Sequence, residues 1–372
     1  MELDKHFDES DPTPGIKTWK RDLLVISMIW LISALLAVIP DLARISNMET
    51  FYLRYLPLIL FNGLILYTIF QKSGLTLRTL TGYGLILIVL ITLVSLLPVT
   101  GSDSSVIALI HVPLFLWCLF GLAFMGFDYR NLGKRIRFIR YNGELLIMTG
   151  LILITGAILV GMTVGLYEAI GIRIPEAVIR NAVVIGSAAA VLAGALIIKV
   201  YPDITARISP VIARLFTPLV LVSVVLYLIA MLFVSERIFK DREMLLLLNF
   251  LLLAIVALIL FSISELDKAR KKDFRVLVLF ILACLALLTN AIALAAILDR
   301  LTGGLTPNRM IIMIANVLVF IHLLLMSLRL YGCYFKGKEI ESVERVAANY
   351  LTVYFVYTVF AMFVFPAFFG YR

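Results

Sequence analysis

The sequence predicts an all-α fold, namely a polytopic integral membrane helical bundle with about eleven transmembrane helices. Long hydrophobic segments alternate with short charged loops along the chain. Hydrophobic residues make up 62% of the 372 residues and charged residues only 15%, whereas soluble domains are about half apolar and about a quarter charged. A bilayer solvates so much apolar helix surface, and a soluble fold has nowhere to place it.

The individual spans follow from segment length, because a helix that crosses a bilayer needs about 20 mostly apolar residues. The run from Leu245 to Phe261 is almost unbroken, whereas β-barrel strands alternate apolar and polar residues. The second span contains Pro57 and Asn62, and the sixth is rich in Ala and Gly. If either is re-entrant, the count falls to ten. The spans are expected near 23–40, 53–71, 82–98, 105–126, 143–167, 177–200, 211–234, 244–264, 275–298, 309–332 and 346–369.

The chain is expected to contain one transmembrane domain, residues 23–372, and a flexible cytoplasmic tail, residues 1–22. The tail is rich in acidic residues and contains Pro12 and Pro14, a composition that favours disorder. The first apolar run starts late, and no small-residue cleavage site follows it. It is therefore expected to remain as an anchor rather than to be removed as a signal peptide.

The distribution of basic residues predicts the orientation. The tail and the even-numbered loops hold 23 of the 33 Lys and Arg residues, and the odd-numbered loops with the C-terminus hold 10. Because Lys and Arg accumulate in short cytoplasmic loops, the N-terminus is expected in the cytoplasm and the C-terminus outside. The net charge of +9 fits partnership with anionic membrane lipids rather than with nucleic acid.

Two stretches suggest an internal repeat at an offset of 132 residues. In each, a basic loop precedes a span, and a short turn with Gly and Pro leads into the next span. The units are residues 105–234 and 237–366, and Pro175 would correspond to Pro307. Both units start on the same side, so the repeat would be parallel, and transport sites often lie between repeats.

Ionisable groups at membrane depth are functional candidates because they are costly there. Glu144 lies at the cytoplasmic mouth of the fifth span. It is a proton or cation site, a partner of Arg140 four residues earlier, or a side chain that extends to the membrane interface. His111 lies near the outer end of the fourth span, two residues before Pro113. The proline frees a backbone carbonyl, so a structural role is the main expectation for His111.

Polar side chains also occur inside the ninth and tenth spans. Asn290 is central in the ninth, and Asn316 and His322 lie in the tenth. Such residues join neighbouring membrane helices by hydrogen bonds worth about 1 kcal/mol. The alternative is a polar pathway through these spans.

The predicted outer turn at 299–309 is the most structured loop. Thr306 is expected to cap the tenth span with Pro307 at its first position. Asp299 and Arg309 are placed to pair across the turn. Asp299, Asn308 and Arg309 remain as candidates for function.

Three motifs together resemble a known family. They are residues 109–117 (LIHVPLFLW), 137–144 (RFIRYNGE) and 304–309 (GLTPNR). In this order and spacing they are similar to a bacterial polytopic membrane family designated domain of unknown function 4153 (DUF4153). The resemblance covers the chain from the second span to the tenth and implies a protein of the bacterial cytoplasmic (inner) membrane. It implies no substrate, cofactor or catalytic residue.

Three functions remain open. The first is a transporter or permease-like protein without its own ATPase, since the sequence has no nucleotide-binding motif. The second is a scaffold or assembly subunit with other membrane subunits as partners. The third is a lipid or glycan transferase, for which the acidic candidates are scattered. The three Cys and three His residues form no metal-binding pattern, and no cofactor is expected. The acidic candidates are Asp41, Asp103, Glu168, Glu236, Asp241 and Asp299.

Overall fold

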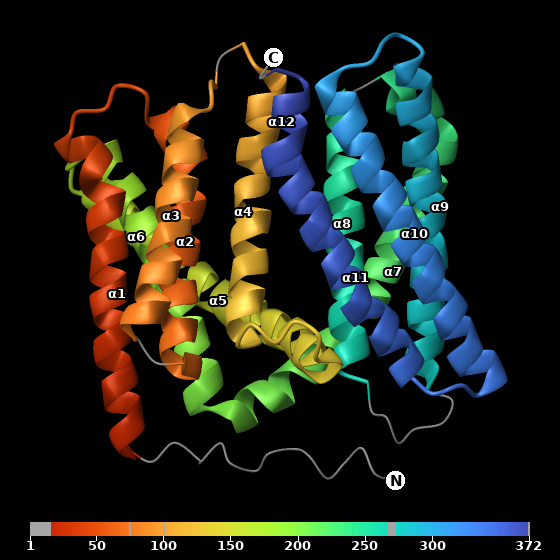
Figure 1. Ribbon diagram of the computed structural model, residues 1–372, viewed down its shortest axis with the longest axis horizontal. Coiled ribbons are helices and arrows are strands. Elements are labelled where there is room, and N and C mark those ends of the chain that lie inside the picture. The colour runs from red at the N-terminus through yellow and green to blue at the C-terminus, as the bar shows by residue number, and fades with distance from the viewer. Residues whose placement is uncertain (1–15, 74–75, 100, 241, 267–272, 371–372) are drawn as a thin grey trace.

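The structure is a computed structural model that describes residues 16–73, 76–99, 101–240, 242–266 and 273–370 (Figure 1). Within these ranges every regular element is a helix. Eleven of the helices in the described part are long and apolar enough to cross a membrane. The predicted class of all-α polytopic bundle is therefore confirmed.

Each predicted span corresponds to one helix. The second and sixth spans are full-length helices, so the count is eleven rather than ten. The last span continues from α11 through one π-helical turn, η1, into α12. The helices are α1 Ile16–Leu42, α2 Met48–Ser73, α3 Leu77–Leu96, α4 Asp103–Phe124, α5 Leu132–Ala169, α6 Glu176–Val200, α7 Pro202–Lys240, α8 Arg242–Ser264, α9 Phe274–Leu301, α10 Pro307–Lys336, α11 Glu341–Val359, η1 Phe360–Val364 and α12 Phe365–Phe368.

Two boundaries differ from expectation. Helix α1 begins at Ile16, so part of the predicted tail is helical, and residues 1–15 lie outside the described residues. Helix α5 begins at Leu132, inside the predicted basic loop. The Asn131 side chain caps it by accepting from the Lys134 backbone N–H at 3.1 Å. Arg and Lys are good helix formers, which lets the basic segment extend the helix.

Two large apolar cores divide the helices into two bundles, and a third, small cluster joins α4 to α10 and the last span through Ile107, Ile311, Ala361 and Phe365. One core is built mainly from α1–α6, here the amino bundle, and the other mainly from α7–α11, here the carboxyl bundle. Figure 1 shows α1, α2 and α3 on one side, α8, α9 and α10 on the other, and α4 and α11 between them. The seam is the set of contacts that α4, α5 and α6 make with α7, α8, α10 and the last span, which comprises α11, η1 and α12.

The helices alternate in direction between two ends of the molecule (Figure 1). The end at which α1 begins is called the N-side, and the end at which α12 finishes is called the C-side. Pro175 directly precedes α6, whereas Pro307 is the first residue of α10. Part of the second basic loop, 268–272, lies outside the described residues, and the superposition of the two units stays a prediction.

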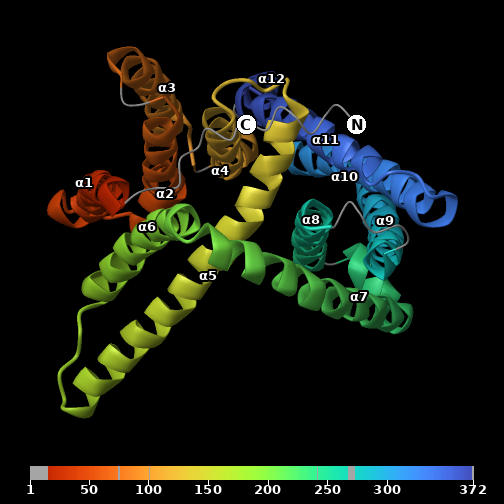
Figure 2. The ribbon, with the colours of Figure 1, turned by 90° about the horizontal axis from the view of Figure 1, so that it is seen from below.

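Helix α5 is 38 residues long, or about 57 Å, against a bilayer core of about 30 Å. Figure 2 shows it running obliquely from the neighbourhood of α4 and α11 to a distant turn that leads into α6. Most of its side chains beyond Gly150 are exposed in the chain, so this part is available to lipid.

Candidate functional site

The predicted polar residues fall into two groups, one inside the carboxyl bundle and one along the seam. The first group joins helices of the same bundle. Asn290, which is fully buried, donates from Nδ2 to Asn316 Oδ1 at 3.1 Å. Asn316 in turn donates to the Ile312 carbonyl at 2.9 Å. These bonds connect α9 to α10 in an otherwise apolar core.

His322 joins α10 to α11 in the same bundle. Its ring stacks on Tyr350 with centroids 4.1 Å apart, and its Nδ1 lies 2.9 Å from the Tyr354 hydroxyl. Tyr350 also donates to the Leu318 carbonyl at 2.6 Å. The arrangement explains His322 as a packing residue of the helix pair.

The seam begins on the C-side with a contact between α4 and α10. Asn308 Nδ2 donates to Asp103 Oδ2 at 2.8 Å. Deeper along the seam, His111 Nε2 lies 3.1 Å from the Tyr357 hydroxyl, and its Nδ1 lies 2.8 Å from the Ile107 carbonyl. His111 therefore ties α4 to α11. Its Nδ1 contacts the Ile107 carbonyl rather than the Leu109 carbonyl that Pro113 leaves without a helical donor.

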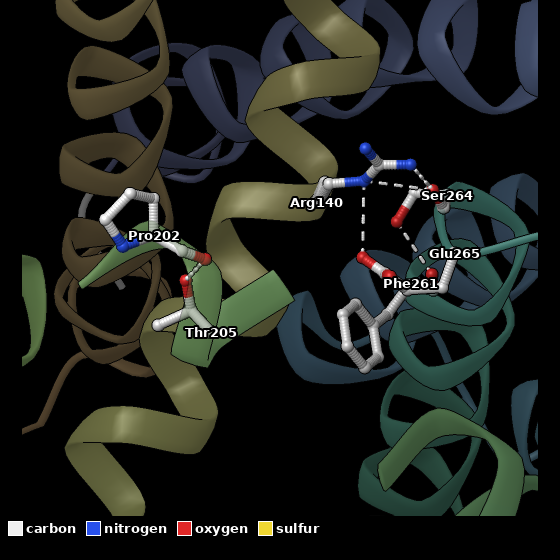
Figure 3. Close-up of polar contacts among 6 residues, drawn as sticks. All are labelled: Arg140, Pro202, Thr205, Phe261, Ser264 and Glu265. Carbon is white, nitrogen blue, oxygen red and sulfur yellow. Dashed lines mark hydrogen bonds and ion pairs between the residues drawn. The ribbon is translucent and has the colours of Figure 1, made fainter. Parts of the chain in front are cut away.

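On the N-side the seam closes through Arg140. Its Nε lies 3.2 Å from Glu265 Oε1, and its guanidinium N–H groups donate to the Ser264 carbonyl (Figure 3). The Glu265 side chain is only 8% exposed, whereas that of Arg140 is 48% exposed. Burial raises the pKa of the Glu265 carboxyl, although the nearby Arg140 charge opposes this shift.

Arg140 thus pairs with Glu265 rather than with Glu144. Ser264 ends α8, and the exposed carbonyls of a helix C-terminus attract a cation. Glu144 remains half-buried on α5, within electrostatic range of both Glu265 and Arg140. The two carboxylates and one guanidinium form a compact charged cluster at the crossing of α5 and α8.

A cavity of about 350 Å³ lies at the C-side end of the seam. Asp103 lines it from α4, and the other lining residues come from α8, α9, α10 and the turn before α10. The surface of the wall is mostly apolar, although six of the ten lining residues are polar or charged, and small-molecule sites combine apolar walls with polar groups in this way. The lining residues are Asp103, Leu245, Leu246, Asn249, Ile297, Arg300, Thr306, Asn308, Arg309 and Ile312.

The turn at 299–309 presents Arg309 to this cavity. Thr306 caps α10 as predicted, by accepting from the Arg309 backbone N–H. Arg309 does not pair with Asp299; its Nη1 donates to the carbonyls of Arg300 and Gly304, at 2.7 and 2.8 Å. Gly304 has a φ of +116°, a conformation that favours glycine and turns its carbonyl toward the guanidinium. Asp299 itself is exposed.

The structure therefore brings Asp103, Asn308 and Arg309 together in the cavity. Asp241 and the side chain of Glu236 lie outside the described part of the chain, and the remaining described candidates do not line the cavity. Asn249 and Arg300 were missed, and Asp103 was expected only under the transferase interpretation. Asn249 could have been selected from the sequence, because it interrupts the apolar run of α8 and a buried amide in a membrane helix is costly without a partner. Asp41, another acidic candidate, pairs instead with Arg180 and Asn181 on α6.

Comparisons of the chain with protein-family models, with curated proteins and with solved structures find no match in any of the three.

Proposed function

We propose that this chain is a transporter or permease-like protein of the bacterial cytoplasmic membrane, in which the two bundles move against each other along the seam. The C-side cavity is the substrate site, and the Arg140–Glu265 contact closes the seam on the N-side. The resemblance to the DUF4153 family supports the bacterial assignment. Energy would come from an ion gradient or from a partner subunit.

The cavity is the observation that carries this proposal. It lies where α4 of the amino bundle meets the carboxyl bundle, and it contains charged and amide groups within an apolar wall. Transport sites commonly lie between such halves of a membrane bundle. The ion pair at the opposite end of the seam supplies the second closure that alternating access requires.

Alternating access predicts that closing one end of the seam opens the other. We expect a disulfide between Asp103→Cys and Asn308→Cys to hold the C-side closed, because these side chains touch across the seam. Ser264→Cys, buried on the N-side, should then react several-fold faster with a maleimide. The measurement is the labelling rate of Ser264→Cys in purified protein whose native cysteines are replaced by serine.

A disulfide between Asn290→Cys and Asn316→Cys is the matched control, since these residues touch within one bundle. It should leave the labelling rate unchanged. If the cross-seam disulfide also leaves the rate unchanged, the seam is rigid and transport by this route is wrong. The apolar interior of the carboxyl bundle then favours the scaffold function.

The excess of basic residues in the tail and the even-numbered loops supports an orientation with the N-side in the cytoplasm. An impermeant maleimide applied to intact cells should label Ile172→Cys and Gly303→Cys and spare Gly133→Cys and Lys338→Cys. All four positions are exposed, so access to the reagent depends on the side of the membrane. Labelling of the second pair with sparing of the first would reverse the orientation.

A further inference from the structure

The C-side cavity holds an arginine whose position is fixed by the backbone. Arg309 Nη1 is engaged by the carbonyls of Arg300 and Gly304. Within the described part of the chain, its Nε and Nη2 groups donate to no protein atom. A guanidinium held in this way loses little freedom on binding a ligand, and its remaining donors suit a phosphate or carboxylate.

The Arg309 charge favours an anion. Asp103 is the acidic residue of the lining, and its carboxylate already accepts a hydrogen bond from Asn308. The Arg309 guanidinium lies beside a low-dielectric apolar wall, where its attraction for an anion is stronger than in water.

Asn249 adds an unused hydrogen-bonding group. Its Oδ1 is buried and has no hydrogen-bond partner among the described residues. A buried amide oxygen without a partner is destabilising, and a hydrogen bond from a ligand hydroxyl would remove that penalty. Asn249 lies four residues after Leu245 on α8, so both face the cavity from one side of the helix.

The apolar wall reaches the lipid-facing surface. Leu245 is buried, whereas Leu246 is 39% exposed and lines the same cavity. Ile297 and Ile312 continue the apolar lining from α9 and α10. A ligand with both a head group and a chain could thus place the head at Arg309 and the chain along α8.

We propose that the C-side cavity binds an anionic phospholipid, with its phosphate on Arg309, a head-group hydroxyl on Asn249 and an acyl chain along Leu245 and Leu246. Phosphate is the shared chemistry of this ligand and of free inorganic phosphate. The apolar wall selects the lipid. That the lipid is the transported substrate rests on the proposed transport function. That the lipid binds in this cavity does not depend on that function.

The test measures binding to the purified full-length chain in a neutral detergent. The probes are dihexanoyl-phosphatidylglycerol, dihexanoyl-phosphatidylcholine and inorganic phosphate. Saturable binding is expected for phosphatidylglycerol, weaker binding for phosphatidylcholine and none for phosphate over the same range. Arg309→Gln should weaken phosphatidylglycerol binding by about tenfold or more, because it removes a charge-assisted bond.

Arg309→Gln also removes the bonds that Arg309 makes to the carbonyls of Arg300 and Gly304, and it could loosen the turn before α10. Two further variants therefore test the site without that side effect. Ile312→Trp fills the cavity while residue 309 remains arginine, and it should also abolish binding. Arg173→Gln removes an exposed cation of the α5–α6 turn and should change nothing.

Three results would overturn the proposal. The first is equal binding of inorganic phosphate, which would assign the site to a free anion. The second is equal weakening by Arg173→Gln and Arg309→Gln, which would mean a general charge effect. The third is binding that survives Ile312→Trp. If the protein binds the lipid but the seam does not move, the proposed transport function is wrong and the lipid site stands. If the seam moves but the lipid does not bind, the lipid site is wrong and the transport function stands.

Discussion

Gly143→Ala should be among the most destabilising single substitutions in this chain. A Cβ atom at this position would lie 1.9 Å from the nearest ring atom of Phe261 and 2.7 Å from the ring's Cγ. The ring cannot avoid it by a small movement of its tip, so α5 and α8 must separate. Overpacking of this kind costs about 1–3 kcal/mol. The measurement is thermal unfolding of the purified protein in detergent, and a melting temperature several degrees lower is expected.

Two variants test whether the crossing itself causes the loss. Gly150→Ala lies on the same helix, and its Cβ would meet nothing within 4 Å. It should be neutral or slightly stabilising, because alanine favours a helix over glycine. Combining Gly143→Ala with Phe261→Ala restores room, so the double variant should lose less stability than the sum of the single variants. Strict additivity would mean that the two residues do not meet.

Arg140→Gln should destabilise the protein by about 1–3 kcal/mol at pH 8, because it leaves the buried Glu265 carboxylate without its cation. Burial already raises the pKa of Glu265 in the folded state. A carboxyl with a raised folded-state pKa favours folding at low pH, and this contribution is lost as the pH rises through that pKa. Removing Arg140 raises the pKa further, so the loss should be larger at pH 8 than at pH 5.

Glu265→Gln is the matched control, since it keeps the shape of the side chain and removes the charge. Alone it should cost little, and combined with Arg140→Gln it should recover most of the stability at pH 8. Denaturation curves at the two pH values measure both effects. A pH-independent loss in Arg140→Gln would show that packing of the arginine, and not its charge, holds the N-side of the seam.

The helices could be predicted because the bilayer imposes a strong length requirement on apolar segments. The Thr306–Pro307 start of α10 was equally predictable, since capping depends on adjacent residues. The extension of α5 through its basic segment was not, because charged helix formers and charged loops have similar composition.

The seam contacts depend on residues far apart in the chain. His111 meets Tyr357 across 246 residues, and no local pattern indicates that partner. For Arg140 the local expectation was Glu144, one helical turn away. The carbonyl end of α8 together with Glu265 offers a stronger site for the guanidinium, so the tertiary contact replaced the local one.

Helix α5 is long and oblique, and its close contact with α8 at Gly143 and Phe261 is the point about which it would pivot. About 39 Å of helix extends from Gly143 toward the turn before α6, and about 16 Å extends the other way to Leu132, from a rise of 1.5 Å per residue. A rotation of about 5° at this point would move the tip of the longer segment by about 3 Å and the tip of the shorter segment by about 1 Å. If the seam moves as proposed, a slight shift of α5 against the carboxyl bundle would produce a larger displacement of the hairpin between α5 and α6, and a change in bilayer thickness at that hairpin would act on the seam through the same helix.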